Sequence, residues 1–273
     1  MSDVLVERQG HTTIITLHRP EKLNAFTTAM GDELTGIMGE FDRDPDQYVA
    51  IITGAGDRAF SSGFDLSEMA GRFGAGNVSA GVSSVDLWGV GSSPKPTIAA
   101  VNGLAVAGGF ELALNCDIRV AADSAWFGLF EVKRGIMAGV GVNLLARYLP
   151  FGEALYLLMT ADRLNAEDAA RLGLVQRLTP SARLMDTAMG IAEMIGANSQ
   201  VAVQASKHVA YQWRNLAIRE QIELYRAVNQ RLLLCEDAVE GARAFVEKRD
   251  PVFVNRWPTA STMRSAQRTE GGT

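Results

Sequence analysis

Cysteine is scarce in this 273-residue chain, which holds only Cys116 and Cys235, far apart in the sequence. This excludes a fold that depends on disulfides, and we expect both residues to be reduced, buried thiols of a cytoplasmic protein. Histidine is also rare, and His11, His18 and His208 show no spacing typical of metal ligands. We therefore expect no metal site.

Long apolar runs and an excess of positive charge are missing as well. No stretch approaches the ~20 apolar residues of a membrane-spanning helix, and the first residues show no secretory signal. The formal net charge is −5, from 26 Lys and Arg against 31 Asp and Glu, so no overall positive field attracts nucleic acid. The hydrophobic fraction of 47% is ample for a buried core. We expect a globular protein with neither a membrane nor a nucleic acid as partner.

The chain does contain a pattern of strands, glycine turns and helices, which indicates an α/β fold. Residues 49–53 and Thr97–Val101 are apolar throughout, as in strands buried on both faces. In Thr28–Arg43 apolar residues recur at three- and four-residue spacing, which predicts a helix. Further strands are expected at residues 4–6, 12–17, 118–121, 125–127 and 174–178.

The second half of the chain is mostly helical in its patterning. Helices are expected at residues 143–148, 153–160, 166–172, 183–197, 201–213, 218–235 and 237–248. We interpret residues 1–200 as an α/β catalytic core, residues 201–258 as a helical region for assembly, and residues 259–273 as a flexible tail. Residues 71–91 are rich in Gly, Ser and Val, and we interpret them as a mobile loop or a loosely held helix.

Two glycine-flanked turns, at residues 59–66 and 102–112, each contain a carboxylate. Such turns can point backbone N–H groups outward at the positive end of a helix dipole. Two of them facing one another would hold one oxygen between a pair of N–H donors, as in an oxyanion hole. Alternatively, the glycines only permit close packing of helix on strand. Their spacing does not fit G-x-G-x-x-G, which disfavours a nucleotide cofactor.

Two glutamates, Glu111 and Glu131, each stand among apolar residues. Burying a carboxylate without compensation is costly, so such residues are usually paired or functional. Each glutamate also has a possible structural role. Glu111 would lie in the first turn of a helix, where a negative charge interacts favourably with the helix dipole, and Glu131 could form a surface ion pair with Lys133 or Arg134. Together the glutamates indicate an acid–base pair around a shared pocket.

A series of short motifs extends along the chain. They are RPEKLNA at 19–25, AFSSGFDL at 59–66, PTIAAVNG at 96–103, AGGFELA at 107–113, FGLFE at 127–131, AARLGLV at 169–175 and FVEKRDPVF at 245–253. In this order they resemble the enoyl-CoA hydratase/isomerase family, also called the crotonase family, over nearly the whole chain. The resemblance implies a spiral core of ββα units, then a helical trimerisation region, in trimers or dimers of trimers.

The resemblance also implies a substrate and its binding residues. The substrate is an acyl-CoA thioester, and no separate cofactor is expected because coenzyme A is part of that substrate. The backbone N–H groups of Phe64 and Gly108 correspond to the family's oxyanion hole. The residues that correspond to the CoA path are Lys22, Leu23, Ala59, Ser62, Asp65, Leu66 and Lys248.

Family hydratases resemble this chain in having both glutamates, which favours an enoyl-CoA hydratase, a hydro-lyase of fatty acid metabolism. Such an enzyme adds water reversibly to a trans-2-enoyl-CoA and forms a 3-hydroxyacyl-CoA. We assign Glu111 to water positioning and activation, Glu131 to proton delivery at C2, and the oxyanion hole to the thioester enolate. One alternative is an enoyl-CoA isomerase of the same family, which needs only one acid. Another is a non-catalytic CoA- or RNA-binding member, and the net charge of −5 argues against RNA.

The chain departs from the family pattern at several positions. Ala107 stands where the family commonly has a third glycine, which should leave the N–H of Gly108 in place. Phe130 stands where hydratases often have proline, and residues 137–141 replace a turn that is usually richer in Pro and Gly. These last departures lie near Glu131, so the preferred acyl chain length cannot be read from the family pattern. They could favour a specialised substrate over a straight fatty acyl chain.

Overall fold

The computed structural model describes residues 2–65, 68, 86–212 and 218–257. The chain forms two compact units, Met1–Glu193 and Met194–Thr273. The interpretation of residues 71–91 as a loop falls largely outside the described residues, and that of residues 259–273 as a tail falls entirely outside them. Within the described part, no helix has the length and apolarity to cross a membrane.

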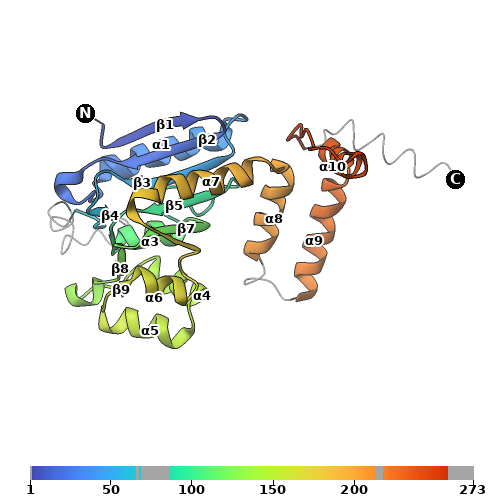
Figure 1. The fold of residues 1–273 in the computed structure, drawn as a ribbon. Coiled ribbons are helices and arrows are strands. Elements are labelled where there is room, and N and C mark those ends of the chain that lie inside the picture. The colour runs from blue at the N-terminus through green and yellow to red at the C-terminus, as the bar shows by residue number, and fades with distance from the viewer. Residues whose placement is uncertain (1, 66–67, 69–85, 213–217, 258–273) are drawn as a thin grey trace. The chain divides into compact units, whose positions relative to one another are not determined.

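A six-stranded sheet forms one layer of the first unit (Figure 1). In spatial order its strands are β1 (Val4–Gln9), β2 (Thr12–Leu17), β3 (Val49–Gly54), β5 (Thr97–Val101), β7 (Ile118–Ala122) and β10 (Arg177–Thr179). The first two form an antiparallel hairpin, and every later pairing in this sheet is parallel. Strands β3 and β5 are buried along their whole length, which explains why their sequences are apolar without alternation.

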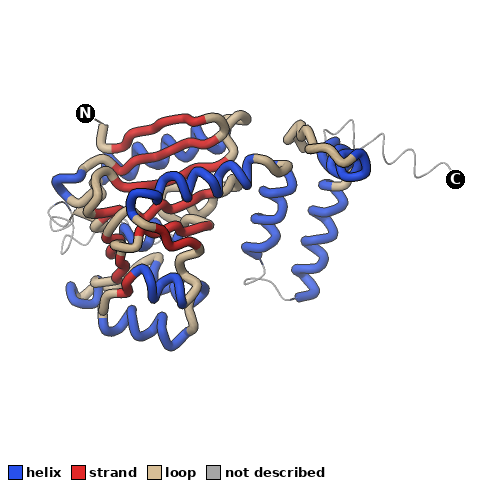
Figure 2. The backbone as a smooth tube through the Cα atoms, viewed as in Figure 1, coloured by secondary structure: helices blue, strands red, loops and turns tan. Residues whose placement is uncertain are grey.

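A second, four-stranded sheet consists of very short strands. These are β4 (Ala59–Ser61), β6 (Leu104–Val106), β8 (Trp126–Gly128) and β9 (Leu164–Asn165). Strands β4, β6 and β8 each follow a strand of the first sheet, so the chain passes repeatedly from one sheet to the other, and Figure 2 shows both sheets in red. At one such corner a Cβ on Gly103 would overlap the Arg58 carbonyl, so the corner requires glycine.

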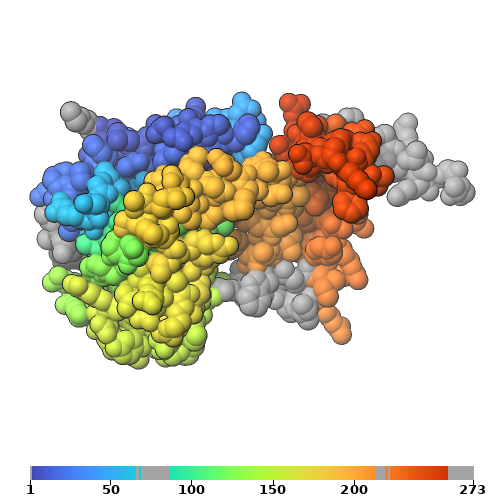
Figure 3. All heavy atoms as spheres, viewed as in Figure 1, coloured from blue at the N-terminus to red at the C-terminus, as the bar shows by residue number. Residues whose placement is uncertain are grey.

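The helices of the first unit surround these sheets. They are α1 (Thr28–Arg43), α3 (Gly108–Asn115), α4 (Gly141–Tyr148), α5 (Phe151–Thr160), α6 (Ala166–Arg171) and most of α7 (Leu184–Gly196). The Thr27 hydroxyl caps α1 by accepting from Met30 N at 3.1 Å, and the apolar face of α1 is buried. In Figure 3 the N-terminal hairpin and helices α5 and α6 lie at opposite ends of this unit.

Helix α3 is the most deeply buried helix segment of the first unit, since every one of its residues is buried. The guanidinium of Arg119, itself 1% exposed, closes its C-terminal end by donating to the carbonyls of Cys116 at 2.7 Å and Ala113 at 3.3 Å. The same guanidinium donates to Leu174 O at 2.6 Å. A buried cation at this end complements the helix dipole and fixes α3 in the core.

The second unit contains α8 (Gln200–Gln212), α9 (Ile218–Leu232) and α10 (Glu236–Glu247). The segment after α10 folds back onto it, because Asp237 accepts from the N–H groups of Val254 and Asn255, and Glu240 pairs with Arg249. Hydrogen bonds from Arg249, from the N–H of Val252 and from Arg243 hold the pKa of Glu240 well below its usual range, and the one from Arg249 is the largest cause.

The α/β class predicted from the sequence is confirmed. The helix Thr28–Arg43 and the strands Thr12–Leu17 and Thr97–Val101 have the predicted bounds, and the other predicted helices and strands differ by a few residues at their ends. The strands β4, β6 and β9 were not predicted. Both Cys116 and Cys235 are buried, and no disulfide joins them.

Candidate active site

The two glycine-flanked turns predicted from the sequence lie in direct contact. A Cβ at Gly63 would be 2.8 Å from Gly108 N, and a Cβ at Gly108 would be 2.9 Å from two ring carbons of Phe64. Gly63 also has a φ of +85°, which disfavours any side chain there. The turns approach so closely only because both positions are glycine, and this brings Phe64 and Gly108 together.

The N–H groups of Phe64 and Gly108 donate to no other residue in the described part of the chain. Gly108 is the first residue of α3, so its N–H has no acceptor within the helix. Phe64 forms a parallel bridge with Phe26, in which Gly63 O accepts from Phe26 N and Asp65 N donates to Phe26 O. That pairing leaves the N–H of Phe64 on the opposite side of the strand. Two backbone donors from neighbouring turns are therefore left without an acceptor among the described residues.

Ala107, the residue before α3, has an unusual backbone conformation with φ of 50° and ψ of −128°. Its N–H donates to Gly128 O at 2.9 Å, which ties this turn to strand β8. A positive φ is disfavoured for residues with a Cβ, so the alanine at this position stores strain. The strain lies directly beside the Gly108 N–H.

Replacing Ala107 with Gly should therefore stabilise the protein. Relief of the left-handed strain outweighs the smaller entropic cost of a glycine in the unfolded chain, and we expect the Tm to rise by about 1–4 °C. Thermal unfolding followed by circular dichroism measures this. The matched control is Ala146→Gly in the middle of helix α4, which should lower the Tm. A lower Tm in both variants would contradict the assignment of strain to Ala107.

Glu111 lies in the first turn of α3 and is 5% exposed. Its Oε1 accepts two hydrogen bonds of 2.8 Å, from the N–H groups of Val140 and Gly141 at the start of α4. Burial raises the pKa of Glu111, and the hydrogen bonds from Gly141 and Val140 partly oppose that rise. One carboxylate oxygen is thus fixed by a helix N-terminus.

Glu131 opens the short 3-10 helix η2 (Glu131–Arg134), which directly follows β8 and Phe130. Its Oε2 is buried and has no hydrogen-bond partner among the described residues. The pKa of Glu131 is raised to about 7, mainly by burial and in smaller part by the charge of Glu111, against the opposing hydrogen bond from its own backbone N–H. The two glutamates therefore interact electrostatically within one site.

Glu131 does not form the surface ion pair that the sequence left open as its structural role. Among the described residues no ion pair joins Glu131 to Lys133 or Arg134, and Lys133 Nζ instead donates to Ala161 O at 2.8 Å. A buried carboxyl oxygen without a partner is costly unless it serves a ligand or a reaction.

Some of the predicted CoA-path residues lie together. Ser62 N donates to Leu23 O at 2.9 Å, and Ser62 Oγ donates to Lys22 O at 3.4 Å, next to the exposed side chain of Lys22. Ala59 is buried in β4. Leu66 lies outside the described residues, and Lys248 belongs to the second unit, where it ends α10.

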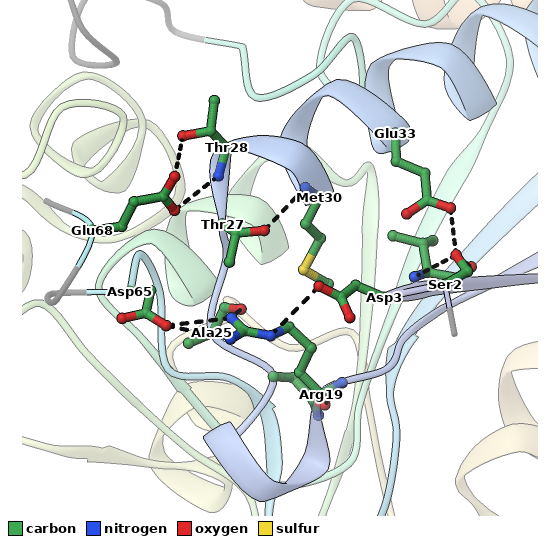
Figure 4. A network of polar contacts seen from close by, with 12 residues as sticks. Ser2, Asp3, Arg19, Ala25, Thr27, Thr28, Met30, Glu33, Asp65 and Glu68 are labelled. Atoms are coloured by element: carbon green, nitrogen blue, oxygen red, sulfur yellow. Dashed lines mark hydrogen bonds and ion pairs between the residues drawn. The ribbon is translucent and has the colours of Figure 1, made fainter.

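The Asp65 side chain is engaged by Arg19, a residue to which no role was assigned from the sequence. Figure 4 shows Arg19 between Asp65, Asp3 and the Ala25 carbonyl, with distances of 3.4, 3.6 and 2.7 Å. Beyond Asp65, Glu68 accepts from the Thr28 hydroxyl and N–H at the start of α1. This network fixes the side chains of Asp65 and Glu68, which follow Phe64 in the sequence.

Asn24 is a second residue that sequence reasoning missed. It is 0% exposed, and its Nδ2 donates to Ala59 O at 2.8 Å and Ala55 O at 3.0 Å. It thereby links the turn that contains Lys22 to strand β4. Both Arg19 and Asn24 belong to the RPEKLNA motif at residues 19–25, and this motif was the feature of the sequence that could have pointed to them.

A family model described as enoyl-CoA hydratase/isomerase matches residues 7–256. The chain belongs to the enoyl-CoA hydratase/isomerase family. The resemblance inferred from the short motifs is thereby confirmed.

Individual members of the family are similar over almost the whole chain. The (E)-benzylidenesuccinyl-CoA hydratase of Thauera aromatica is 35% identical over 258 residues, which cover 92% of this chain and 98% of that protein. The short-chain-enoyl-CoA hydratase of Clostridium acetobutylicum is 34% identical over 251 residues, which cover 91% and 96%. The crystal structure of an enoyl-CoA hydratase from Bacillus anthracis matches with a TM-score of 0.89 and 33% identity, and covers 93% of this chain and 100% of that chain. The crotonase-like fold is confirmed.

Proposed function

We propose that this family member is an enoyl-CoA hydratase, which adds water reversibly to a trans-2-enoyl-CoA and forms a 3-hydroxyacyl-CoA. The observation that carries the proposal is the pair of buried Glu111 and half-buried Glu131, whose Oε2 is buried and whose pKa is raised in part by the charge of Glu111. Hydration needs a base for water and an acid for C2, and the two glutamates supply both. Similarity to curated hydratases over most of the chain supports the same activity.

In the proposed reaction, the thioester carbonyl oxygen accepts hydrogen bonds from the N–H groups of Phe64 and Gly108. Glu111, with Oε1 held by α4, takes a proton from water through its other oxygen while the water oxygen bonds to C3. The electron pair of the double bond moves to the thioester, and the N–H pair stabilises the enolate. Protonated Glu131 then delivers its proton to C2, which completes the addition.

The raised pKa of Glu131 gives the reaction a characteristic pH dependence. Hydration requires the protonated acid, so kcat/KM for hydration should fall as pH rises through about 7, the pKa of Glu131. The reverse dehydration uses the same single proton, held on Glu111 instead of Glu131. Because the net reaction takes up no proton, its equilibrium constant does not depend on pH, and kcat/KM for dehydration should fall through the same pH. Initial rates in both directions across this range measure the two profiles. A kcat/KM for hydration that stays constant as pH rises through about 7 would contradict the assignment.

The remaining parts of the proposal concern binding and assembly. Lys22, Leu23, Ala59, Ser62, Asp65 and Leu66 line the CoA path. Lys248, of this or a neighbouring subunit, helps to bind the CoA phosphates. Since coenzyme A is part of the substrate, no separate cofactor takes part. The protein works as a homotrimer or a dimer of trimers in the cytoplasm, in fatty acid metabolism.

Isotope labelling tests the proposed activity against isomerisation. Incubated with an enoyl-CoA in heavy-oxygen water, a hydratase places the label on C3 of the product, whereas an isomerase moves the double bond without incorporating label. Repeating the assay over a ladder of acyl chain lengths identifies the preferred substrate. Bond migration without label at every chain length would overturn the proposal.

A further inference from the structure

A stack of cationic and aromatic side chains reaches the residue that precedes Glu131. The guanidinium carbon of Arg163 lies 4.2 Å from the centre of the Trp126 ring, and the ring centres of Trp126 and Phe130 are 6.1 Å apart. Lys133 Nζ also lies 5.1 Å from the centre of the Phe130 ring. Cations over aromatic faces attract them electrostatically. We call Arg163, Trp126, Phe130 and Lys133 the cation–aromatic stack.

The Phe130 ring is also pressed against the backbone of strand β8. A Cβ at Gly128 would lie 2.8 Å from Phe130 Cζ, so the ring occupies the space that any side chain at position 128 would need. The carbonyl of Gly128 accepts from Ala107 N, next to the Gly108 N–H. The ring therefore rests on the same piece of backbone that holds the turn opening α3.

Lys133, which lies over the Phe130 ring, is itself anchored to helix α5. It belongs to the same short helix as Glu131, and its Nζ donates to Ala161 O at the C-terminal end of α5. The N–H of Lys133 donates to Phe130 O at 3.0 Å, which closes the first turn of this helix. The backbone at Glu131 is thus held from both sides, by the ring before it and by the anchored lysine after it.

We infer that Phe130 is a positioning residue for Glu131, and that the cation–aromatic stack fixes the backbone from which the Glu131 carboxyl reaches the substrate. Proline would fix φ near −65° by its own ring, whereas Phe130 has a φ of −99°, outside the range that proline allows. The backbone at position 130 is therefore held by contacts of the Phe130 side chain, whereas a proline at this position would hold it through its own ring. Its role rests on the proposed function, in which Glu131 delivers the proton.

The test compares variants of Phe130 in steady-state hydration assays of the full chain. Phe130→Leu retains an apolar side chain but loses the stack, and we expect kcat to fall about 10-fold or more with KM changed by less than about twofold. Phe130→Tyr retains the ring and should keep kcat within about twofold of the unmodified protein. The matched control is Val132→Ala on the same short helix, where the side chain is 45% exposed and outside the stack.

A double-variant cycle asks whether Phe130 acts through Glu131. If it does, Phe130→Leu should lower kcat by less than about twofold when Glu131 is already replaced by Gln. An equal loss of kcat in both backgrounds, or an unchanged kcat of Phe130→Leu in the native background, would overturn the inference. Both results presuppose that the unmodified protein hydrates and that Glu131→Gln impairs it. Failure of either condition instead contradicts the proposed function.

Lys133→Met provides a second variant, because Lys133 is exposed and its replacement does not disturb the core. It removes both the cation over Phe130 and the hydrogen bond to Ala161 O. We expect a loss in kcat of about threefold, with KM unchanged and the Tm retained. A kcat equal to that of the unmodified protein would show that the stack has no part in positioning Glu131.

Discussion

Replacement of Glu131 with Gln is expected to lower kcat for hydration by about 100- to 10,000-fold, the contribution typical of general acid–base catalysis. Glutamine has nearly the same shape but cannot deliver a proton to C2. Binding of a saturated acyl-CoA should remain close to that of the unmodified protein, because the N–H pair of Phe64 and Gly108 is untouched. Steady-state kinetics and calorimetric titration measure the two effects separately.

The same variant makes an independent prediction about stability. The folded protein holds Glu131 with a pKa of about 7, above the ordinary value of 4.5, so its favourable contribution is present below about pH 4.5 and lost as pH rises through 7. Glutamine carries no charge to bury, and the Tm of Glu131→Gln should exceed that of the unmodified protein at pH 8. The difference should shrink toward pH 5.

The control for both measurements is Glu40→Gln, an exposed glutamate on helix α1. It should change neither kcat nor the pH dependence of the Tm. Turnover by Glu131→Gln at the rate of the unmodified protein would refute the proton-donor role, even if the Tm behaves as expected.

Replacement of Gly63 with Ala should lower kcat/KM by about 100- to 1,000-fold, the loss typical when an oxyanion-hole donor is displaced. The added Cβ would lie 2.8 Å from Gly108 N and would require an alanine at a φ of +85°. The two turns must separate to accommodate it, which moves the Phe64 and Gly108 N–H groups away from a common acceptor.

Gly36→Ala in helix α1 is the matched control, because no atom lies within 4 Å of a Cβ at Gly36. This exposed helical position should gain stability and keep full activity. Circular dichroism of both variants establishes that they fold. A folded Gly63→Ala protein with unchanged kcat/KM would contradict the oxyanion-hole assignment.

The elements that could be predicted from the sequence carry local signals. Helix α1 has a threonine cap and an apolar face at helical spacing, and strands β3 and β5 are short continuous apolar runs. Such signals depend on neighbouring residues alone, so they can be recognised without knowledge of the fold. The α/β class followed from their order along the chain.

Three strands of the second sheet, β4, β6 and β9, could not be predicted, because they are too short to have a pattern of their own. Strand β6 spans Leu104–Val106 and pairs with β8 through Leu104 and Trp126, which lie far apart in the sequence. These strands exist because the distant partner supplies the hydrogen bonds. The close approach of the two glycine turns depends on this pairing.

For the candidate site, residue types could be predicted but contacts could not. Glu111 and Glu131 were found as carboxylates among apolar residues, whereas the donors to Glu111 come from residues 29 and 30 positions further along. Arg19 engages Asp65 across 46 positions. No local rule connects residues at such separations, so only the folded backbone reveals these partners.

The hydrogen bonds from Val140 and Gly141 to Glu111 link the chemistry to the local order of a helix. The N-terminal N–H groups of a helix have no acceptors within it, and here a buried carboxylate provides one at the start of α4. In the proposed cycle Glu111 gains and loses a proton at every turnover. A protonated Glu111 is a weaker acceptor for the N–H groups of Val140 and Gly141, and loss of the proton restores its strength. The first turn of α4 should therefore open more readily at the stage of the reaction in which Glu111 is protonated.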